Sequence, residues 1–240
     1  GDTARSRAAD DGETVEEAAI QVSPVAAAVA ANTPSPQAPM APGWVEGQHY
    51  KALPAPQPTA VPAGMVEVTE IFWYGCGHCY HLEPALEAWN AKGRPEYVKL
   101  NYLPVVWNPV TREDARLFYT IEALGKVSAL QSAVFRELHV NGNPLTVMSG
   151  SQVDMAATEK KAREFLVRNG ITAEDFNRTY RSFAVENRLR SGELMLRRYQ
   201  ADHTPMIVVN GKWTTDVSMA GGPDALFRLV NALAARERGR

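Results

Sequence analysis

Apolar and polar positions along the first folded part of the chain follow the order strand, helix, strand. A run of β-branched and aromatic residues predicts a strand over 66–73, apolar positions at helical spacing predict a helix over 78–91, and a second strand is predicted over 96–103. A shorter segment, 48–53, is typical of an edge strand. This β-α-β order favours parallel strands joined by a right-handed crossover.

Helical periodicity then continues to about residue 200. Ser151 and Thr172 precede two of the predicted helices and are suitable N-caps, because a side-chain oxygen at that position accepts a hydrogen bond from the first free N–H groups. The predicted helices cover 112–124, 127–138, 152–168 and 173–196, the last with a break near Ser182.

Strand character returns near the C-terminus, at 206–210. The dipeptide Asn210-Gly211 predicts a tight turn into another strand over 213–217. A final amphipathic helix is predicted over 224–236. The complete order is β-α-β, a helical block and β-β-α, which predicts an α/β protein with a small mixed sheet flanked by helices.

Composition narrows the class of protein. A hydrophobic fraction of 45% with 22% charged residues is typical of a soluble globular protein. The net charge of −2 argues against a nucleic-acid or anionic-membrane partner, since either needs a basic surface. No apolar stretch reaches the roughly 18 residues that a membrane-spanning helix requires.

Residues 1–42 differ from the rest of the chain, being rich in Ala, Pro, Ser and acidic residues. Such a composition buries too little apolar surface to offset chain entropy, so we expect a disordered tail with at most a short helix over 13–20. The tail suits a spacer between an anchor and a domain, and a dispensable leader fits equally well. The sequence begins at Gly1, which is compatible with removal of an export signal.

The chemistry of the chain centres on its only cysteines, Cys76 and Cys79. Two cysteines cannot staple a fold of this size, so the pair is retained for its reactivity. Cys76 lies at a predicted helix start, where unpaired N–H groups and the helix dipole stabilise a thiolate, the nucleophile of thiol–disulfide exchange. Cys79 follows one turn later, and His78 between them can add positive charge or a hydrogen-bond donor.

Other interpretations of these residues remain open at this point. A purely structural disulfide would close a very short loop and stabilise the fold little. A zinc site needs two further ligands, of which only His81 is near. His78 can also be an ordinary helix residue, and Trp73, Tyr74 and Tyr80 are more often packing residues than substrate contacts.

Several segments carry a resemblance to a known family. The segment 70–80, reading EIFWYGCGHCY, is similar to the active-site segment of DsbA-type periplasmic thiol oxidases. The similarity continues through 169–176 and 181–183 of the helical block. It ends with 204–213, reading TPMIVVNGKW, which is similar to the cis-proline loop and hairpin of that family.

The resemblance implies a thioredoxin-like fold with an inserted helical domain. The thioredoxin-like part would comprise 43–110 and 202–240, and the insertion 111–201. Cys76 would be the exposed attacking cysteine and Cys79 the buried resolving one. Pro205 would follow a cis bond and face the disulfide, and the backbone of Thr204 would pair with an extended substrate.

The resemblance also assigns a role to Glu70, as a buried acid beneath the disulfide that relays the proton of Cys79. The position expected to hold its lysine partner is occupied by Asn101, and Lys99 can compensate from two residues away. The alternative is that Glu70 is an ordinary exposed residue of an edge strand.

The function implied is donation of a disulfide to cysteine pairs of exported proteins in the bacterial periplasm, where the tail can serve as a tether to a membrane. The redox-active disulfide is the only redox group implied, with no further cofactor and no metal. A quinone-linked membrane partner of the DsbB type would reoxidise the protein, and we expect a monomer. The dipeptide Gly77-His78, typical of eukaryotic protein disulfide isomerases, keeps an isomerase or reductase as the closest alternative, and a chaperone-like binding module as a more distant one.

Overall fold

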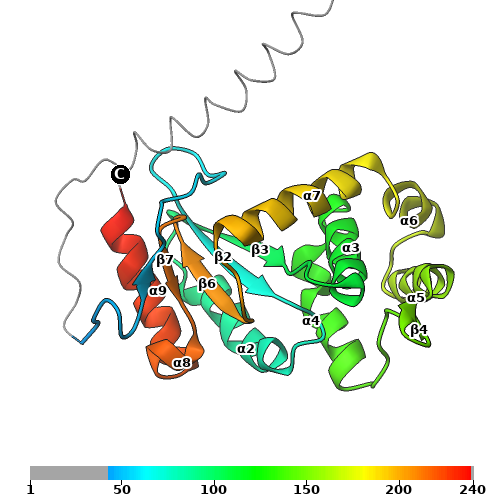
Figure 1. Cartoon of the computed structure of the whole chain (residues 1–240), viewed down its shortest axis with the longest axis horizontal. Coiled ribbons are helices and arrows are strands. Elements are labelled where there is room, and N and C mark those ends of the chain that lie inside the picture. The colour runs from blue at the N-terminus through cyan, green and yellow to red at the C-terminus, as the bar shows by residue number, and fades with distance from the viewer. Residues whose placement is uncertain (1–42, 239–240) are drawn as a thin grey trace, which may run out of the picture.

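The computed structural model describes residues 43–238, so the predicted tail and its short helix lie outside the described residues. A five-stranded mixed sheet has the order β1-β7-β6-β2-β3 (Figure 1). Its strands are β1 (Lys51–Ala52), β2 (Val66–Phe72), β3 (Val98–Pro104), β6 (Met206–Val209) and β7 (Trp213–Thr215).

The second strand is the structural centre of the sheet. It runs parallel to β3 and antiparallel to β6, and each of its residues is buried. Near the start of the strand, Val68 packs in an apolar cluster that includes Leu86 and Leu229. Phe72, at the other end of the strand, belongs to a second cluster that includes Phe118. The active-site segment therefore leaves a strand that is held by packing along its whole length.

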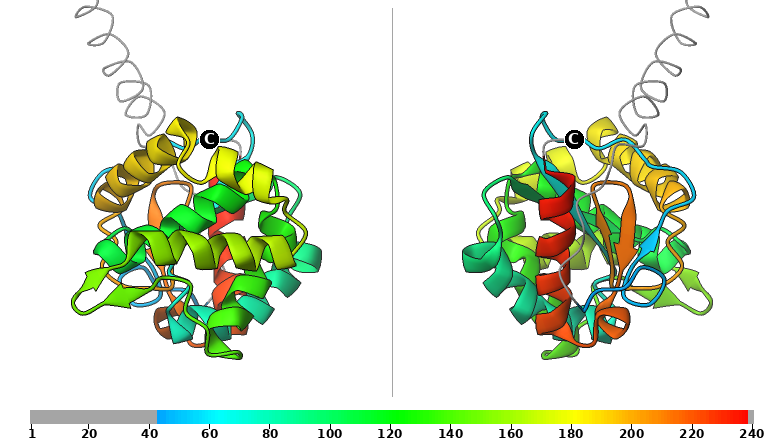
Figure 2. Two further views of the ribbon diagram at one scale, coloured as in Figure 1. Left: turned by 90° about the vertical axis from the view of Figure 1, so that its right-hand side faces the viewer. Right: turned by 90° about the vertical axis from the view of Figure 1, so that its left-hand side faces the viewer.

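The helices follow the predicted order. One group lies with the sheet at one end of the molecule and the helices between β3 and β6 lie together at the other end (Figures 1 and 2). The α-helices and a π-helical turn are α2 (Gly77–Ala88), η1 (Trp89–Gly93), α3 (Pro109–Ala123), α4 (Val127–His139), α5 (Met155–Arg168), α6 (Ala173–Thr179), α7 (Phe183–Arg198), α8 (Val217–Ala220) and α9 (Pro223–Glu237).

Capping residues explain where several helices begin. Thr172 caps α6 as predicted, and the predicted break at Ser182 is confirmed because its side chain caps α7. The prediction that Ser151 caps a helix is wrong. A short hairpin of β4 (Met148–Ser149) and β5 (Gln152–Val153) occupies this stretch, and the side chain of Asp154 caps α5 instead.

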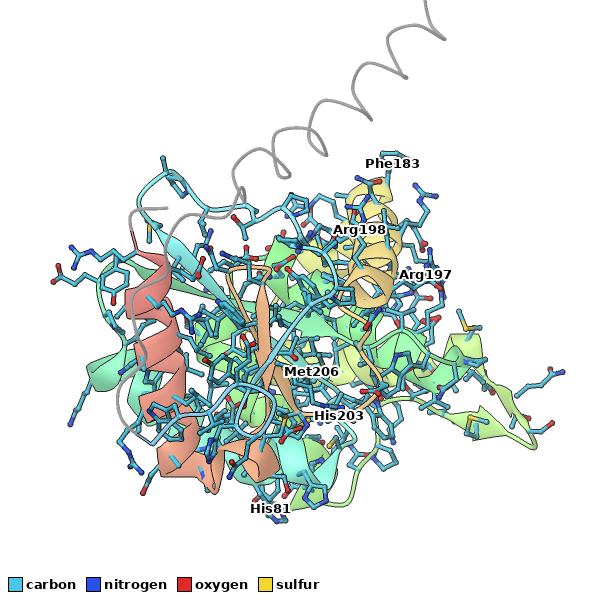
Figure 3. All side chains as sticks on the ribbon, turned by 60° about the vertical axis from the view of Figure 1, so that its left-hand side comes forward. His81, Phe183, Arg197, Arg198, His203 and Met206 are labelled. Carbon is cyan, nitrogen blue, oxygen red and sulfur yellow. The ribbon has the colours of Figure 1, made fainter. Side chains whose placement is uncertain are left out.

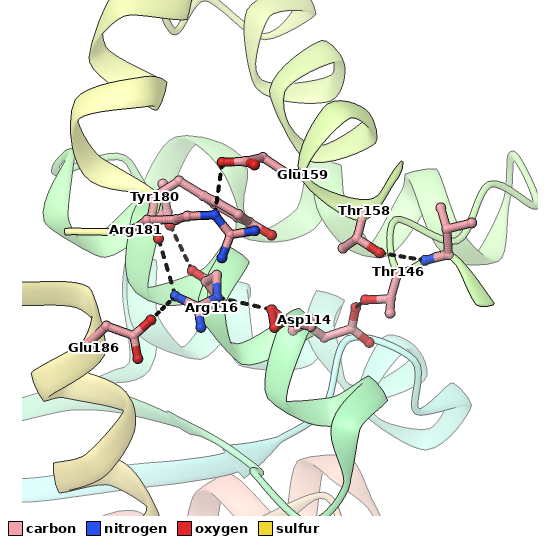
Figure 4. Close-up of polar contacts among 11 residues, drawn as sticks. Asp114, Arg116, Thr146, Thr158, Glu159, Tyr180, Arg181 and Glu186 are labelled. Carbon is pink, nitrogen blue, oxygen red and sulfur yellow. Dashed lines mark hydrogen bonds and ion pairs between the residues drawn. The ribbon is translucent and has the colours of Figure 1, made fainter. Parts of the chain in front are cut away.

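A buried ionic cluster joins α3 to α7 (Figure 4). The guanidinium of Arg116 pairs with the carboxylates of Glu113 and Glu186 and donates to the carbonyl oxygen of Tyr180. Arg116 and Glu113 are almost fully buried. The hydrogen bonds replace the water that these charged groups lose on folding.

Within residues 43–238, none of the helices combines the length and the apolar character that crossing a bilayer requires.

Candidate active site

The first cysteine caps the helix that follows β2. Cys76 has extended backbone angles (φ −82°, ψ 119°), and its Sγ accepts a hydrogen bond from the Cys79 backbone N–H at 3.3 Å. Its own N–H donates to the Trp73 carbonyl at 3.0 Å, which closes a turn between strand and helix. The sulfur thus lies where a helix N-terminus presents free N–H groups.

These donors favour the charged form of the sulfur. Hydrogen bonds from the Cys79 thiol, from the Thr204 side chain and from the backbone N–H groups of Cys79 and His78 lower the pKa of Cys76 to about 5, although partial burial acts in the opposite direction. A thiol with such a pKa is mostly thiolate at neutral pH and is both a ready nucleophile and a good leaving group.

The second cysteine has the opposite environment. Cys79 is fully buried on the inner face of α2. Burial is the main cause that raises its pKa far above that of a free thiol, and the nearby carboxyl of Glu70 adds to it. The predicted contrast between an accessible Cys76 and a buried Cys79 is confirmed in its geometry.

The loop before β6 faces the first cysteine. The Thr204–Pro205 bond is cis, as the resemblance implied. The carbonyl oxygen of Thr204 lies 3.6 Å from the Cys76 Sγ and accepts from its thiol. Residues 128 positions apart therefore form one site.

A pocket of about 340 Å³ extends from this loop. The start of α2 contributes His78, His81 and Leu82, and the opposite wall comes from His203 to Pro205 and from the start of α8. Figure 3 labels His81 and His203 near the same end of the molecule. His78 is exposed at the pocket wall, and its contribution to the Cys76 pKa is its backbone N–H. The pocket shares Thr204 with the site, and the carbonyl oxygen of that residue contacts the Cys76 sulfur atom.

The acidic residue near the two cysteines, Glu70, lies in the interior of the protein. Glu70 is fully buried in β2, and neither carboxyl oxygen has a hydrogen-bond partner. Burial, with the charges of Glu83 and Cys76, raises its pKa well above the usual value. The alternative of an exposed edge-strand residue is therefore wrong.

The expectation that Lys99 compensates for a missing partner is also wrong. In the parallel β2–β3 register Lys99 is aligned with Glu67 and Asn101 with Thr69, whereas Glu70 is aligned with Tyr102. Side chains on a strand alternate between faces, so both residues point away from the face of Glu70. Burial raises the pKa of Glu67, and the charge of Lys99 acts on this residue, opposing the rise, and not on Glu70.

One acidic residue of the site was not predicted. Glu83 is buried on α2, one turn after Cys79, and its Oε1 accepts from the Ser132 hydroxyl at 3.3 Å. Burial raises its pKa to about 7, and the neighbouring Glu87 contributes. The signal was present in the sequence, because positions 79, 82, 83 and 86 share one helical face, and an acid on an apolar face predicts a buried carboxyl.

A thioredoxin-like sheet, a helix capped by a reactive cysteine and a facing cis-proline loop define a thiol–disulfide oxidoreductase. No protein-family model matches the chain. Among curated proteins, it is 35% identical over 192 residues to the thiol:disulfide interchange protein DsbA of Azotobacter vinelandii, covering 80% of this chain and 84% of that one. It is 33% identical over 195 residues to DsbA of Pseudomonas aeruginosa, covering 81% and 86%.

Solved structures agree with these relatives. A crystal structure of P. aeruginosa DsbA superimposes with a TM-score of 0.72 at 32% identity and covers 81% of this chain and 94% of that one. The oxidoreductase DsbA of Xylella fastidiosa gives a TM-score of 0.70 at 27% identity, with 82% and 98% covered. The chain belongs to the DsbA family of thiol:disulfide interchange proteins.

Proposed function

We propose that this protein oxidises cysteine pairs of exported proteins in the bacterial periplasm, with Cys76 as the attacking and attacked sulfur. The observation that carries the proposal is the contrast between the two cysteines: Cys76 is partly exposed and caps α2, whereas Cys79 is fully buried. These surroundings lower the pKa of Cys76 to about 5 and raise that of Cys79. A stabilised Cys76 thiolate favours the reduced form of the pair, so the oxidised form readily gives its disulfide away.

The exchange proceeds in two displacements. A substrate thiolate attacks the Cys76 Sγ of the Cys76–Cys79 disulfide, forms a mixed disulfide and expels the Cys79 sulfur as a thiolate. The second substrate thiolate then attacks the substrate sulfur of the mixed disulfide, forms the substrate disulfide and expels the Cys76 thiolate. The substrate loses two electrons and the Cys76–Cys79 pair gains them.

The buried acid serves the first displacement. Cys79 is expelled into a dry environment where its thiolate is unfavourable, so it must take up a proton. Glu70 lies close enough for its charge to affect Cys79, and burial keeps its carboxyl protonated to a higher pH than usual. The carboxyl of Glu70 donates this proton and recovers one afterwards.

Recognition and recycling complete the proposal. An extended substrate segment lies along the pocket between His78 and the Thr204–Pro205 loop and pairs with the backbone of Thr204. A membrane protein of the DsbB type accepts the electrons and restores the disulfide. No cofactor other than this disulfide takes part, and the protein acts as a monomer.

Trapping and potential measurements test the proposal together. Cys79→Ser should accumulate mixed disulfides with a reduced, unfolded cysteine-containing protein, whereas Cys76→Ser should not. Equilibration with glutathione should give a reduction potential more oxidising than that of glutathione. A more reducing potential would favour the reductase alternative, and trapping through Cys79 would reverse the assigned roles.

A further inference from the structure

The ring of Trp73 packs directly against Gly75, the residue before the active-site cysteine. A Cβ atom added to Gly75 would lie 2.4 Å from Cζ2 and 2.6 Å from Cε2 of Trp73, far inside van der Waals contact. The Trp73 indole therefore occupies the space where a side chain would be. Because the Trp73 carbonyl also accepts from the Cys76 N–H at 3.0 Å, the ring and the turn position the cysteine together.

The ring is itself fixed from the helical insertion. The Trp73 Nε1–H donates to Oδ2 of Asp114 at 2.7 Å, and Asp114 is a buried residue of α3. Its other oxygen accepts from the Thr146 hydroxyl at 2.5 Å, a contact drawn in Figure 4. Both carboxylate oxygens are thus engaged, and the indole cannot turn without leaving one of them unpaired.

We propose that Asp114 is a positioning residue of the thiol–disulfide exchange, acting through the Trp73 ring on Gly75 and the turn that places the Cys76 sulfur. This inference rests on the proposed function, in which Cys76 is the reactive sulfur. Hydrogen bonds weaken steeply with distance and angle, so a small shift of the turn lengthens the bond from the Cys79 N–H to Cys76. The hydrogen bonds of Asp114 go to Trp73 and Thr146, whereas those to the Cys76 sulfur come from Cys79, Thr204 and His78.

Asp114→Ala tests the role by removing both acceptors. The pKa of Cys76, followed by thiolate absorbance, should rise, and the equilibrium constant with glutathione should shift toward the oxidised protein by about threefold. This shift is smaller than the roughly tenfold or more that corresponds to one lost hydrogen bond to a charged group. Asp114→Asn retains an acceptor for the indole and should restore most of the parent value.

The neighbouring residue supplies a matched control. Glu113 is also a buried acid of α3, but it pairs with Arg116 and not with Trp73. Glu113→Gln should lower the thermal midpoint and leave the Cys76 pKa and the glutathione equilibrium within error of the parent. If Glu113→Gln shifts them as much as Asp114→Ala does, Asp114 has only a structural role.

A double-mutant cycle tests the route through the ring. Trp73→Phe removes the N–H and the ring atoms over Gly75, so adding Asp114→Ala to it should shift the glutathione equilibrium no further. Additive shifts would overturn the proposal, and Trp73→Phe alone serves if Asp114→Ala does not fold. The trapping experiment tests the proposed function separately: if that function is wrong, Cys76 of the protein with an unchanged Trp73 and Asp114 does not form mixed disulfides.

Discussion

At the scale of single residues, the chemistry depends on two sulfur atoms that meet opposite surroundings. Cys76 receives donors and keeps contact with solvent, whereas Cys79 is enclosed. Compared with an ordinary thiol of pKa 9.0, a Cys76 pKa of about 5 makes the cysteine pair more oxidising at pH 7 by at most about 60 mV. This is an upper limit because the partial exposure of Cys76 weakens each electrostatic contribution. Replacing single side chains around the two sulfur atoms should therefore change the Cys76 pKa or the rate of exchange measurably.

Thr204→Val should raise the pKa of Cys76. The substitution keeps the shape of the side chain and removes a hydrogen bond that stabilises the thiolate, so the expected rise is up to about one unit. Titration of thiolate absorbance measures it. Thr215→Val is the control, since Thr215 is a buried threonine of β7 that donates to His49, and it should leave the Cys76 pKa unchanged.

Glu70→Gln should slow exchange and stabilise the fold at higher pH. Folding raises the pKa of Glu70, so ionising this carboxyl costs more in the folded than in the unfolded protein and lowers the free energy of unfolding. The loss of stability is complete above the folded-state pKa and disappears as pH falls below the unfolded-state pKa. The variant should gain a few degrees in thermal midpoint at pH 8 and less at pH 5. Equal midpoint differences at both pH values, with unchanged exchange rates, would contradict the proton-transfer role.

At the scale of elements, the start of α2 combines reactivity with an ordinary helix cap. Cys76 occupies the N-cap position that a serine or aspartate often fills, and its sulfur accepts as their oxygen would. Gly77 is the first helical residue; a Cβ atom added to it would meet no atom within 4 Å, and its backbone does not need positive φ. The helix can therefore be stiffened without obstructing the site.

Gly77→Pro should stabilise the protein by about 0.4–1 kcal/mol, because proline restricts the unfolded chain and fits the first position of a helix. Cys76 already has the extended backbone angles that a residue before proline prefers. The N–H groups of His78 and Cys79 remain available to the sulfur. Urea denaturation checks the gain, with Gly77→Ala as the control, and a loss of stability would show that the turn needs the glycine.

The elements also show how far the sequence could predict the structure. The strand around Val68, the reactive helix start and the break at Ser182 carry local signals of period or capping, and the structure confirms them. The β4–β5 hairpin and α8 were missed because strands of two residues and a helix of four leave no readable period. Whether Lys99 lies on the same face of the sheet as Glu70 depends on the register between β2 and β3. A shift of one residue in that register would move its side chain to the other face.

At the scale of the whole molecule, the redox state of the pair should alter the stability of the fold. Folding lowers the pKa of Cys76, so ionisation stabilises the reduced protein at pH above the folded pKa of about 5, increasingly up to the unfolded value near 9. The thermal midpoint of the reduced protein relative to the oxidised one should therefore fall as pH decreases from 8 to 5. A difference that is independent of pH would contradict the assignment of the thiolate.

The separation of Cys76 and Thr204 along the chain, 128 residues, has a consequence for biogenesis. A chain that emerges from its N-terminus presents both cysteines long before β6 and the loop that precedes it exist. Until these late segments are made, Cys76 has the local donors of α2 but lacks the Thr204 contact, which forms only when β6 pairs with β2. The newly made chain therefore carries both thiols before the complete set of groups that surrounds Cys76 in the folded protein has been assembled.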